Sequence, residues 1–203
     1  MSAPPILAVI LAGGLARRMG GGDKPLAMLA GRPLIAHVIE RIRPQVAALA
    51  INANGDPARF AGFGLPVIAD GVADHPGPLA GVLAGLEWAR VHRPDVAAVL
   101  SVPGDAPFLP ADLASRLAAA GPLSLAASGG EIHPTAALWP VALAPALRAA
   151  LVSEGLRKVR LFTGRHGART VEWPVAPVDP FFNANTPDDI AAAERIAATL
   201  ARG

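Results

Sequence analysis

Short aliphatic runs alternate with segments of helical spacing along the first half of the chain, and this alternation restricts the fold more than any other feature. Each run is too short for a helix and ends at glycine, proline or polar residues, which is typical of a buried parallel strand. The expected strands cover residues 6–11, 46–51, 65–69 and 96–102, and the expected helices cover residues 33–43, 78–91 and 110–120. This alternation predicts an α/β fold: a three-layer, Rossmann-like, mostly parallel sheet with helices on both faces.

The second half of the chain is less regular. The expected strands there cover residues 123–127, 136–139 and 170–175, and the expected helices cover residues 143–151, 156–162 and 187–201. The last helix has a clear start, because Thr186 suits the N-cap and Pro187 suits the first helical position. A chain of 203 residues with no internal repeat or low-complexity linker fits a single domain, residues 1–203.

The composition excludes several classes of protein. The chain contains no cysteine, which excludes thiol catalysis, thiolate zinc sites and iron–sulfur clusters. Only 17% of residues are charged and the formal net charge is +2, so we expect no nucleic-acid partner. No apolar run reaches the roughly 18 residues of a membrane span, and no positively charged segment precedes the first apolar stretch as in a signal peptide. We therefore expect a cytoplasmic protein with no membrane partner.

Polar or glycine residues follow each of the first four expected strands. Gly13 follows the first strand, Asn52 the second, Asp70 the third and Asp105 the fourth. The carboxyl ends of parallel strands meet at one edge of the sheet, and this edge is where open α/β sheets bind ligands. We therefore expect these four residues, which are distant in sequence, to meet in one cleft.

The loop after the first strand has the composition of a phosphate-binding loop. Residues 11–25 contain five glycines, whose backbone N–H groups can turn toward an anion, together with the cations Arg17, Arg18 and Lys24. The Walker pattern does not match, because Lys24 is not followed by serine or threonine, and the glycine spacing does not match the dinucleotide fingerprint. Lys24 is one of only two lysines in the chain, which favours a compact point charge at this position.

The carboxylate and amide residues of the expected cleft have two interpretations each. Asp105 suits a ligand of Mg²⁺ opposite a triphosphate, and the alternative is a turn aspartate before the next helix. Asn52 and Asp70 suit contacts to a base or ribose, and the alternative is that they stabilise turns.

Several motifs together resemble the nucleotidyltransferases of the nucleotide-diphospho-sugar transferase fold and, within them, the molybdenum cofactor guanylyltransferase family. The first is the glycine loop, with Leu11-Ala12-Gly13-Gly14, Arg17-Arg18-Met19-Gly20-Gly21 and Asp23-Lys24. The others are Asn52-Ala53-Asn54, Asp70, Gly77-Pro78-Leu79-Ala80-Gly81, Pro103-Gly104-Asp105-Ala106-Pro107, His133-Pro134-Thr135-Ala136-Ala137-Leu138 and Phe182-Asn183-Ala184-Asn185-Thr186-Pro187. The resemblance thus extends over nearly the whole chain.

The resemblance implies an enzyme that transfers GMP from GTP to the phosphate of molybdenum-loaded molybdopterin, uses Mg²⁺ and releases pyrophosphate. It implies a GTP-binding half of about residues 1–110, an acceptor-binding half of about residues 111–203, and transient contacts with molybdoenzymes or other proteins of cofactor biosynthesis. The implied GTP contacts are Leu11, Ala12, Gly13, Lys24, Asn52, Asp70 and Asp105. Asp105 is also the implied metal ligand, and Lys24, Arg18 and Asp105 are the implied catalytic residues. Asn183 and Asn185 match positions on the pterin side, and the alternative is that they are turn residues before the last helix.

Two other functions remain open at this point. One is a cytidylyltransferase or another nucleotidyltransferase of the same fold, although the paired glycines of Gly13-Gly14 are the form associated with guanine. The other is a non-catalytic GTP-binding module that delivers the cofactor to apoenzymes. Three residues of the second half, His133, Arg157 and Lys158, are possible acceptor contacts, and the alternatives are a hydrogen-bonded structural histidine and solvated helix residues.

Overall fold

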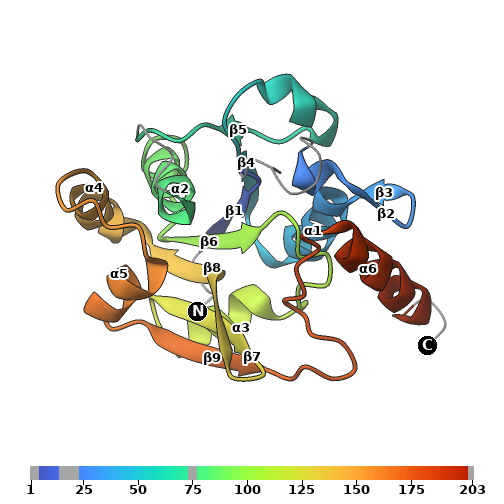
Figure 1. The fold of residues 1–203 in the computed structure, drawn as a ribbon. Helices are drawn as coiled ribbons and strands as arrows, with labels where there is room; N and C mark the ends of the chain where they lie inside the picture. The colour runs from blue at the N-terminus through green and yellow to red at the C-terminus, as the bar shows by residue number, and fades with distance from the viewer. Residues whose placement is uncertain (1–4, 14–22, 73–76, 201–203) are drawn as a thin grey trace.

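A computed structural model describes residues 5–13, 23–72 and 77–200 of the chain, and its centre is a seven-stranded sheet with helices on both faces (Figure 1). The strands of this sheet are β1 (Ile6–Leu11), β4 (Ala48–Asn52), β5 (Val67–Ile68), β6 (Ala98–Pro103), β7 (Ser124–Ser128), β8 (Glu131–Pro140) and β9 (Arg169–Trp173). The α-helices are α1 (Leu34–Ile42), α2 (Pro78–His92), α3 (Leu113–Ala120), α4 (Ala144–Val152), α5 (Val159–Arg165) and α6 (Pro187–Leu200). The shorter elements are the hairpin of β2 (Met28–Leu29) and β3 (Arg32–Pro33) and the 3₁₀ segments η1 (Lys24–Leu26), η2 (Arg43–Gln45), η3 (Pro57–Phe63) and η4 (Val141–Leu143).

The sheet is mostly parallel, which confirms the predicted fold class. Its strand order is β5-β4-β1-β6-β8-β7-β9, and only the pairs that include β8 are antiparallel. The direction of β8 follows from its connection to β7, which consists of Gly129 and Gly130 with positive φ values of 57° and 79°. A two-residue hairpin turn with two positive φ values requires glycine or similarly permissive residues and makes its strands antiparallel.

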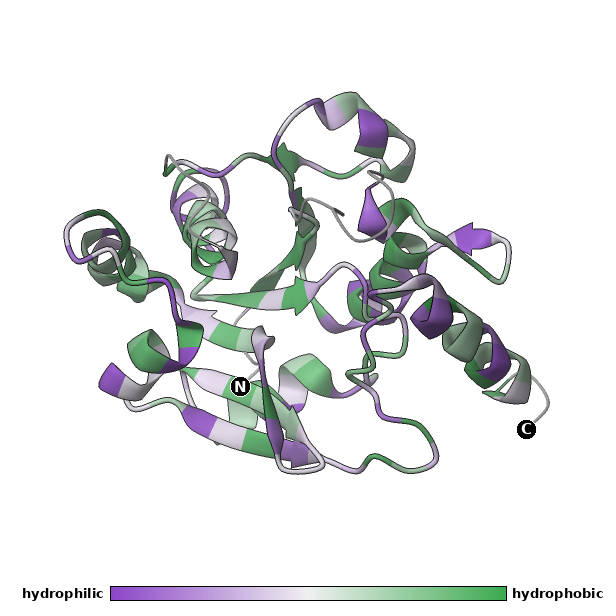
Figure 2. Ribbon diagram, viewed as in Figure 1, coloured by the Kyte–Doolittle hydropathy of each residue, from purple (hydrophilic) through white to green (hydrophobic). Residues whose placement is uncertain are grey.

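Both faces of the central strands are buried, which explains why their sequences are continuously aliphatic. In β1, the side chains of Ile6, Ala8 and Ile10 pack in the core cluster that includes α1 and α3. The side chains of Leu7 and Val9 pack in the opposite cluster, which includes α2, α4 and α5. Figure 2 shows the hydrophobic residues concentrated in these central strands and the hydrophilic residues in the outer loops and along α6.

Helix α6 lies outside the main sheet, beside the hairpin of β2 and β3 (Figure 1). Its start is the predicted one, and a reciprocal cap stabilises it. The N–H of Asp189 donates to Thr186 Oγ1 at 3.1 Å, and the Asp189 carboxylate accepts from the N–H groups of Thr186 at 2.8 Å and Asn185 at 2.9 Å. None of the helices in the described residues combines the length and the hydropathy that a membrane span requires.

A buried hydrogen bond joins β6 to β8 and generates a stability prediction. Trp139 Nε1 donates to Ser101 Oγ at 2.9 Å, and both residues are fully buried. The substitution Ser101→Ala leaves the indole N–H without a partner in the core, which costs about 1–3 kcal/mol. Urea unfolding is expected to show a loss of this size. The matched control is Ser115→Ala, whose hydroxyl is exposed, and equal losses in the two variants would contradict the prediction.

Candidate active site

A cavity of about 600 Å³ opens at the carboxyl ends of β1, β4, β5 and β6. Strands β4 and β5 lie on one side of β1 and β6 lies on the other, so the cavity is at the point where the strand order reverses. Its volume is in the range of small-molecule sites, roughly 300–1,000 Å³. The described residues that line it are Leu11, Ala12, Gly13, Asp23, Lys24, Pro25, Asn52, Asn54, Arg59, Asp70, Gly77, Pro78, Pro103, Asp105, Thr135, Asn183 and Asn185. The structure therefore brings together every described residue that the sequence analysis assigned to GTP or to the pterin side.

The predicted phosphate loop is described only at its two ends. At the first end, the N–H of Ala12 donates to Asn52 O at 2.8 Å, which keeps the chain beside β4 as it leaves the sheet. Residues 14–22 lie outside the described residues, and the predicted catalytic residue Arg18 is among them. At the second end, the chain returns at Asp23 and Lys24 along the wall of the cavity.

A network of amide and carboxylate groups forms one end of the cavity. Asn52 Nδ2 donates to Asp70 Oδ1 at 2.8 Å, and Asn54 Nδ2 donates to Asp70 Oδ2 at 2.8 Å. Asn54 Oδ1 in turn accepts from the N–H of Asp70 at 2.9 Å. Asn52 is only 4% exposed, so its orientation is set by these contacts and not by solvent. The network holds the Asp70 carboxylate in one orientation at the end of β5.

A second cluster joins three distant parts of the chain. Lys24 Nζ donates to Asp105 Oδ2 at 3.2 Å and also to Asn185 Oδ1. The side chains of Lys24 and Asp105 are 24% and 18% exposed, so solvent screens this ion pair only in part. The backbone supports the same arrangement, since the N–H of Ala184 donates to Asp105 O at 2.9 Å. These bonds place the segment before α6 against the end of β6 and beside Lys24.

Asn183 carries a buried oxygen that has no hydrogen-bond partner in the described structure. This atom is Oδ1 of the side chain, and the residue lines the cavity. Buried polar atoms in native proteins are nearly always hydrogen-bonded, so an exception requires an explanation. A donor group on a ligand in the cavity would supply the missing bond.

Sequence analysis missed Arg59, which also lines the cavity. Arg59 belongs to η3, where neither periodicity nor a motif marks a site, and its guanidinium forms an ion pair with Asp23. The sequence analysis assigns Asp23 to a motif but gives it no role. A basic side chain five residues after Asn54 is the available signal, but nothing in the sequence shows that it reaches the cavity.

Three possible acceptor contacts are absent from the described residues that line the cavity: His133, Arg157 and Lys158. His133 Nε2 lies 2.7 Å from Ser128 Oγ, its ring stacks on Phe181, and burial lowers its pKa below the ordinary value. Arg157 and Lys158 are exposed just before α5. The structure thus places His133 in a hydrogen-bonded cluster and the two cations in solvent.

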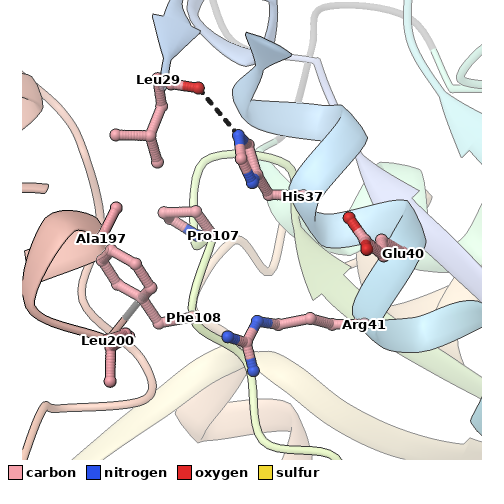
Figure 3. A pocket seen from close by; sticks show the side chains of 8 residues that line it. All are labelled: Leu29, His37, Glu40, Arg41, Pro107, Phe108, Ala197 and Leu200. Carbon is pink, nitrogen blue, oxygen red and sulfur yellow. Dashed lines mark hydrogen bonds between the residues drawn. The ribbon is translucent and has the colours of Figure 1, made fainter. Parts of the chain in front are cut away.

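A smaller depression of about 250 Å³ lies between α1, α6 and the loop after β6 (Figure 3). Its polar side chains are already used by the fold. His37 donates from Nε2 to Leu29 O at 2.9 Å, and Arg41 donates from Nη1 to Leu109 O at 3.3 Å. No residue that the sequence analysis assigned to a site lines this depression, so the larger cavity is the candidate active site.

The comparisons with known proteins agree with each other. Residues 8–170 match the family model described as MobA-like NTP transferase domain. The molybdenum cofactor guanylyltransferase of Rhodopseudomonas palustris (strain BisB5) is 61% identical, over 96% of this chain and 95% of that protein. The molybdenum cofactor guanylyltransferase of Bradyrhizobium sp. (strain ORS 278) is 60% identical, over 94% of this chain and 92% of that protein.

Solved structures show the same fold. Molybdopterin-guanine dinucleotide biosynthesis protein A from Archaeoglobus fulgidus has a TM-score of 0.68 and 25% identity, over 96% of this chain and 99% of that chain. A nucleotidyl transferase from Methanothermobacter thermautotroptrophicus has a TM-score of 0.74 and 18% identity, over 98% of this chain and 100% of that chain. The second likeness concerns the fold alone.

The packing of α2 against Asn52 generates a prediction for the site. A Cβ atom on Gly81 would lie 2.2 Å from Asn52 Oδ1 and 2.9 Å from Leu11 Cδ2. The substitution Gly81→Ala is therefore expected to displace Asn52 and break its bond to Asp70. Affinity for GTP, the nucleotide expected from the sequence, should fall about tenfold in titration calorimetry, because an oriented hydrogen bond of 1–2 kcal/mol is lost.

The matched control lies one turn further along α2. A Cβ atom on Gly85 would meet Val9 Cγ2 at 2.7 Å in the core, away from Asn52. Gly85→Ala should lower the unfolding free energy but leave GTP affinity nearly unchanged. If both variants lost GTP affinity equally, the effect would come from general loosening of α2, and the prediction about Asn52 would be wrong.

Proposed function

The chain belongs to the MobA-like NTP transferase family and, within it, to the molybdenum cofactor guanylyltransferases, and from this premise we propose the reaction that its cavity performs. The protein transfers GMP from GTP to the terminal phosphate of molybdenum-loaded molybdopterin and releases pyrophosphate. One observation carries the proposal. Lys24 lies between Asp105, at the end of a nucleotide-side strand, and Asn185, in the segment before the last helix, so one cation touches both halves of the cavity.

The cavity has two ends that suit the two ends of a nucleoside triphosphate. The network of Asn52 and Asp70 offers fixed hydrogen-bonding groups for the base or ribose. Lys24, together with backbone N–H groups of the glycine loop, suits the triphosphate, because a cation and oriented amides are the groups that bind phosphate. Leu11, Ala12 and Gly13 also line the cavity. Of the lining residues, Thr135, Asn183 and Asn185 belong to the proposed acceptor half.

The reaction requires positioning and charge neutralisation more than proton transfer. A terminal phosphate oxygen of molybdopterin forms a bond to the α-phosphorus of GTP. The bond from the α-phosphorus to the oxygen of the β-phosphate breaks, and pyrophosphate leaves with that electron pair. The attacking phosphate is already ionised at neutral pH, so no strong base is needed. Lys24, and Arg18 in the loop, hold the leaving phosphates and stabilise the charge that develops on them.

We assign the metal to Asp105, and the donor set suits Mg²⁺. The described residues contain no group of three or more histidine, aspartate or glutamate side chains that could hold a metal alone. Mg²⁺ needs no such group, because it commonly uses one or two carboxylates and completes its shell with water and substrate phosphates. The metal supplies positive charge to the phosphate oxygens when bound. Asp105 would hold the metal, and Lys24 would then be free to contact the phosphates.

We assign the pterin side to Asn183 and Asn185. The unpartnered Oδ1 of Asn183 supports this assignment over a purely structural turn, since a donor on the acceptor would complete its hydrogen bonding. Asn185 has a structural role as well, because its N–H donates to the carboxylate of Asp189 at the start of α6. Its side chain is separate from that role and faces Lys24.

Replacement of Lys24 tests the proposed phosphate contact. Lys24→Ala should slow pyrophosphate release by about two to three orders of magnitude, because the loss of one preorganised donor costs about 2–4 kcal/mol in the transition state. The assay contains GTP, Mg²⁺ and molybdenum-loaded molybdopterin. Lys158→Ala is the matched control, since it removes the other lysine at an exposed position. A Lys24→Ala protein with a native circular dichroism spectrum and a normal rate would refute the assignment.

Replacement of Asp105 tests the proposed metal ligand. Asp105→Asn keeps the size of the side chain but removes its charge, so the Mg²⁺ concentration for half-maximal rate should rise at least about tenfold. Asp95→Asn is the control, because that carboxylate is exposed and paired with Arg93. An Mg²⁺ titration that matches the unsubstituted protein would remove Asp105 from the metal site. The same assay with CTP in place of GTP separates the guanylyltransferase from a cytidylyltransferase.

A further inference from the structure

Arg59 is held more firmly than a surface arginine, although it belongs to a 3₁₀ segment on the connection between β4 and β5. Its Nη1 donates to Asp23 Oδ1, its Nη2 donates to Asn54 O at 2.6 Å, and its Nε donates to Asp56 O at 3.0 Å. The guanidinium carbon also lies 5.0 Å from the ring centre of Phe60, which is fully buried. Each guanidinium nitrogen therefore has a partner, and the planar fork has one orientation.

The carboxylate of Asp23 does not cap the 3₁₀ segment that it precedes. Asp23 precedes η1 at the N-cap, where an aspartate side chain normally accepts from the backbone of the next turn, yet it makes no such bond. Asp56 occupies the same position before η3 and does cap it, accepting from the N–H of Ala58 at 2.9 Å. The Asp23 carboxylate turns instead to Arg59. Its role is therefore to bind Arg59.

The contacts of Arg59 connect the two ends of the cavity. Asp70 is held by Asn54, Asn54 O accepts from Arg59, and Arg59 binds Asp23. Asp23 is the residue before Lys24, so this chain of contacts runs from the amide and carboxylate network to the proposed phosphate contact. The ion pair of Asp23 with Arg59 also attaches the end of the glycine loop at Asp23 to the connection between β4 and β5.

A negative charge at Asp23 does not by itself favour the binding of a triphosphate. A carboxylate in the wall of a triphosphate site repels the ligand, and this repulsion weakens binding unless the carboxylate has another use. Pairing with Arg59 neutralises that charge and fixes the backbone where Lys24 begins. We propose that Arg59 is a positioning residue that acts through Asp23 to direct Lys24 toward the phosphates of GTP, and that Arg59 does not itself bind GTP. This inference rests on the proposed function of Lys24.

The decisive variant is Asp23→Ala, because the two explanations predict opposite signs. If Arg59 acts through Asp23, removal of the carboxylate releases Lys24, and GTP affinity in titration calorimetry falls about five- to tenfold, the size of a coupling between contacting residues. If Arg59 binds GTP directly, removal of a negative charge leaves GTP affinity unchanged or raises it. Asp23→Asn is a second variant that keeps the side-chain shape, and the positioning role predicts a loss for it as well.

Epistasis with Lys24 gives an independent measurement. Arg59→Ala should lower GTP affinity about as much as Asp23→Ala. The double variant Asp23→Ala/Arg59→Ala should bind GTP no more weakly than either single variant. In a Lys24→Ala background, Arg59→Ala should change GTP affinity less than twofold. Arg59→Lys keeps the positive charge but loses the planar guanidinium group. Its GTP affinity should therefore lie between those of Arg59→Ala and the unsubstituted protein. Additive losses of Arg59 and Lys24, or full recovery by Arg59→Lys, would overturn the proposal.

The controls separate this inference from the proposed function. Arg93→Ala removes an arginine from an exposed ion pair with Asp95 and should leave GTP affinity unchanged. If the unsubstituted protein transfers GMP and Lys24→Ala impairs it, but Asp23→Ala binds GTP normally, only the positioning role fails. If Lys24→Ala has no effect on GTP binding or pyrophosphate release, the proposed function of Lys24 fails first.

Discussion

Parallel pairing of β4, β1 and β6 is the interaction on which the site depends. In the register of these strands, Leu11 of β1 pairs with Asn52 of β4 on one side and with Pro103 of β6 on the other. The three strands therefore end at the same level, and the residues that follow them leave the sheet together. Continuous aliphatic side chains bury both faces of these strands, and the backbone hydrogen bonds of the parallel ladders hold the strands in this register. The cavity is thus a consequence of the core.

Each carboxylate in the described cavity wall has a different partner, and this difference assigns its role. Asp70 is held by two asparagine amides, and Asp23 is held by Arg59. Asp105 is paired with Lys24, the cation proposed to move to the phosphates. In the proposed reaction, the first two carboxylates would keep their partners when a polyanion enters, while Asp105 would exchange Lys24 for the metal. A cavity with three carboxylates can therefore bind a highly negative ligand, because their charges are neutralised separately.

The sequence predicts which strand-end residues form the site, but not the ion pair between Asp23 and Arg59 that supports it. Short aliphatic runs and the polar residues that follow them are sufficient to predict Asn52 and Asp105 at one edge of the sheet, because burial is a local property of the pattern and alternation with helices indicates parallel strands. The sequence predicts a strand over residues 136–139, whereas β8 covers Glu131–Pro140. This strand contains Pro134, which has no N–H to donate, and its pairing with β7 shifts register between Leu125 and Ala126. The ion pair of Asp23 with Arg59 depends on a tertiary contact between two segments without regular strands or α-helices. The hydrophobic periodicity of the sequence therefore cannot predict it.

The tripeptide Asn-Ala-Asn occurs twice in the wall of the cavity, with the same local packing each time. At residues 52–54 and again at residues 183–185, the central alanine is buried in a core cluster and both flanking asparagines line the cavity. The backbone anchors each alanine, because the N–H of Ala53 donates to Ile68 O at 3.0 Å and the N–H of Ala184 donates to Asp105 O at 2.9 Å. A small buried side chain lets the backbone lie close to the sheet, and the neighbouring asparagines then line the cavity. The first tripeptide begins at the end of β4 and the second precedes α6, so the same packing principle builds the two parts of the cavity wall that we propose for the nucleotide and for the acceptor.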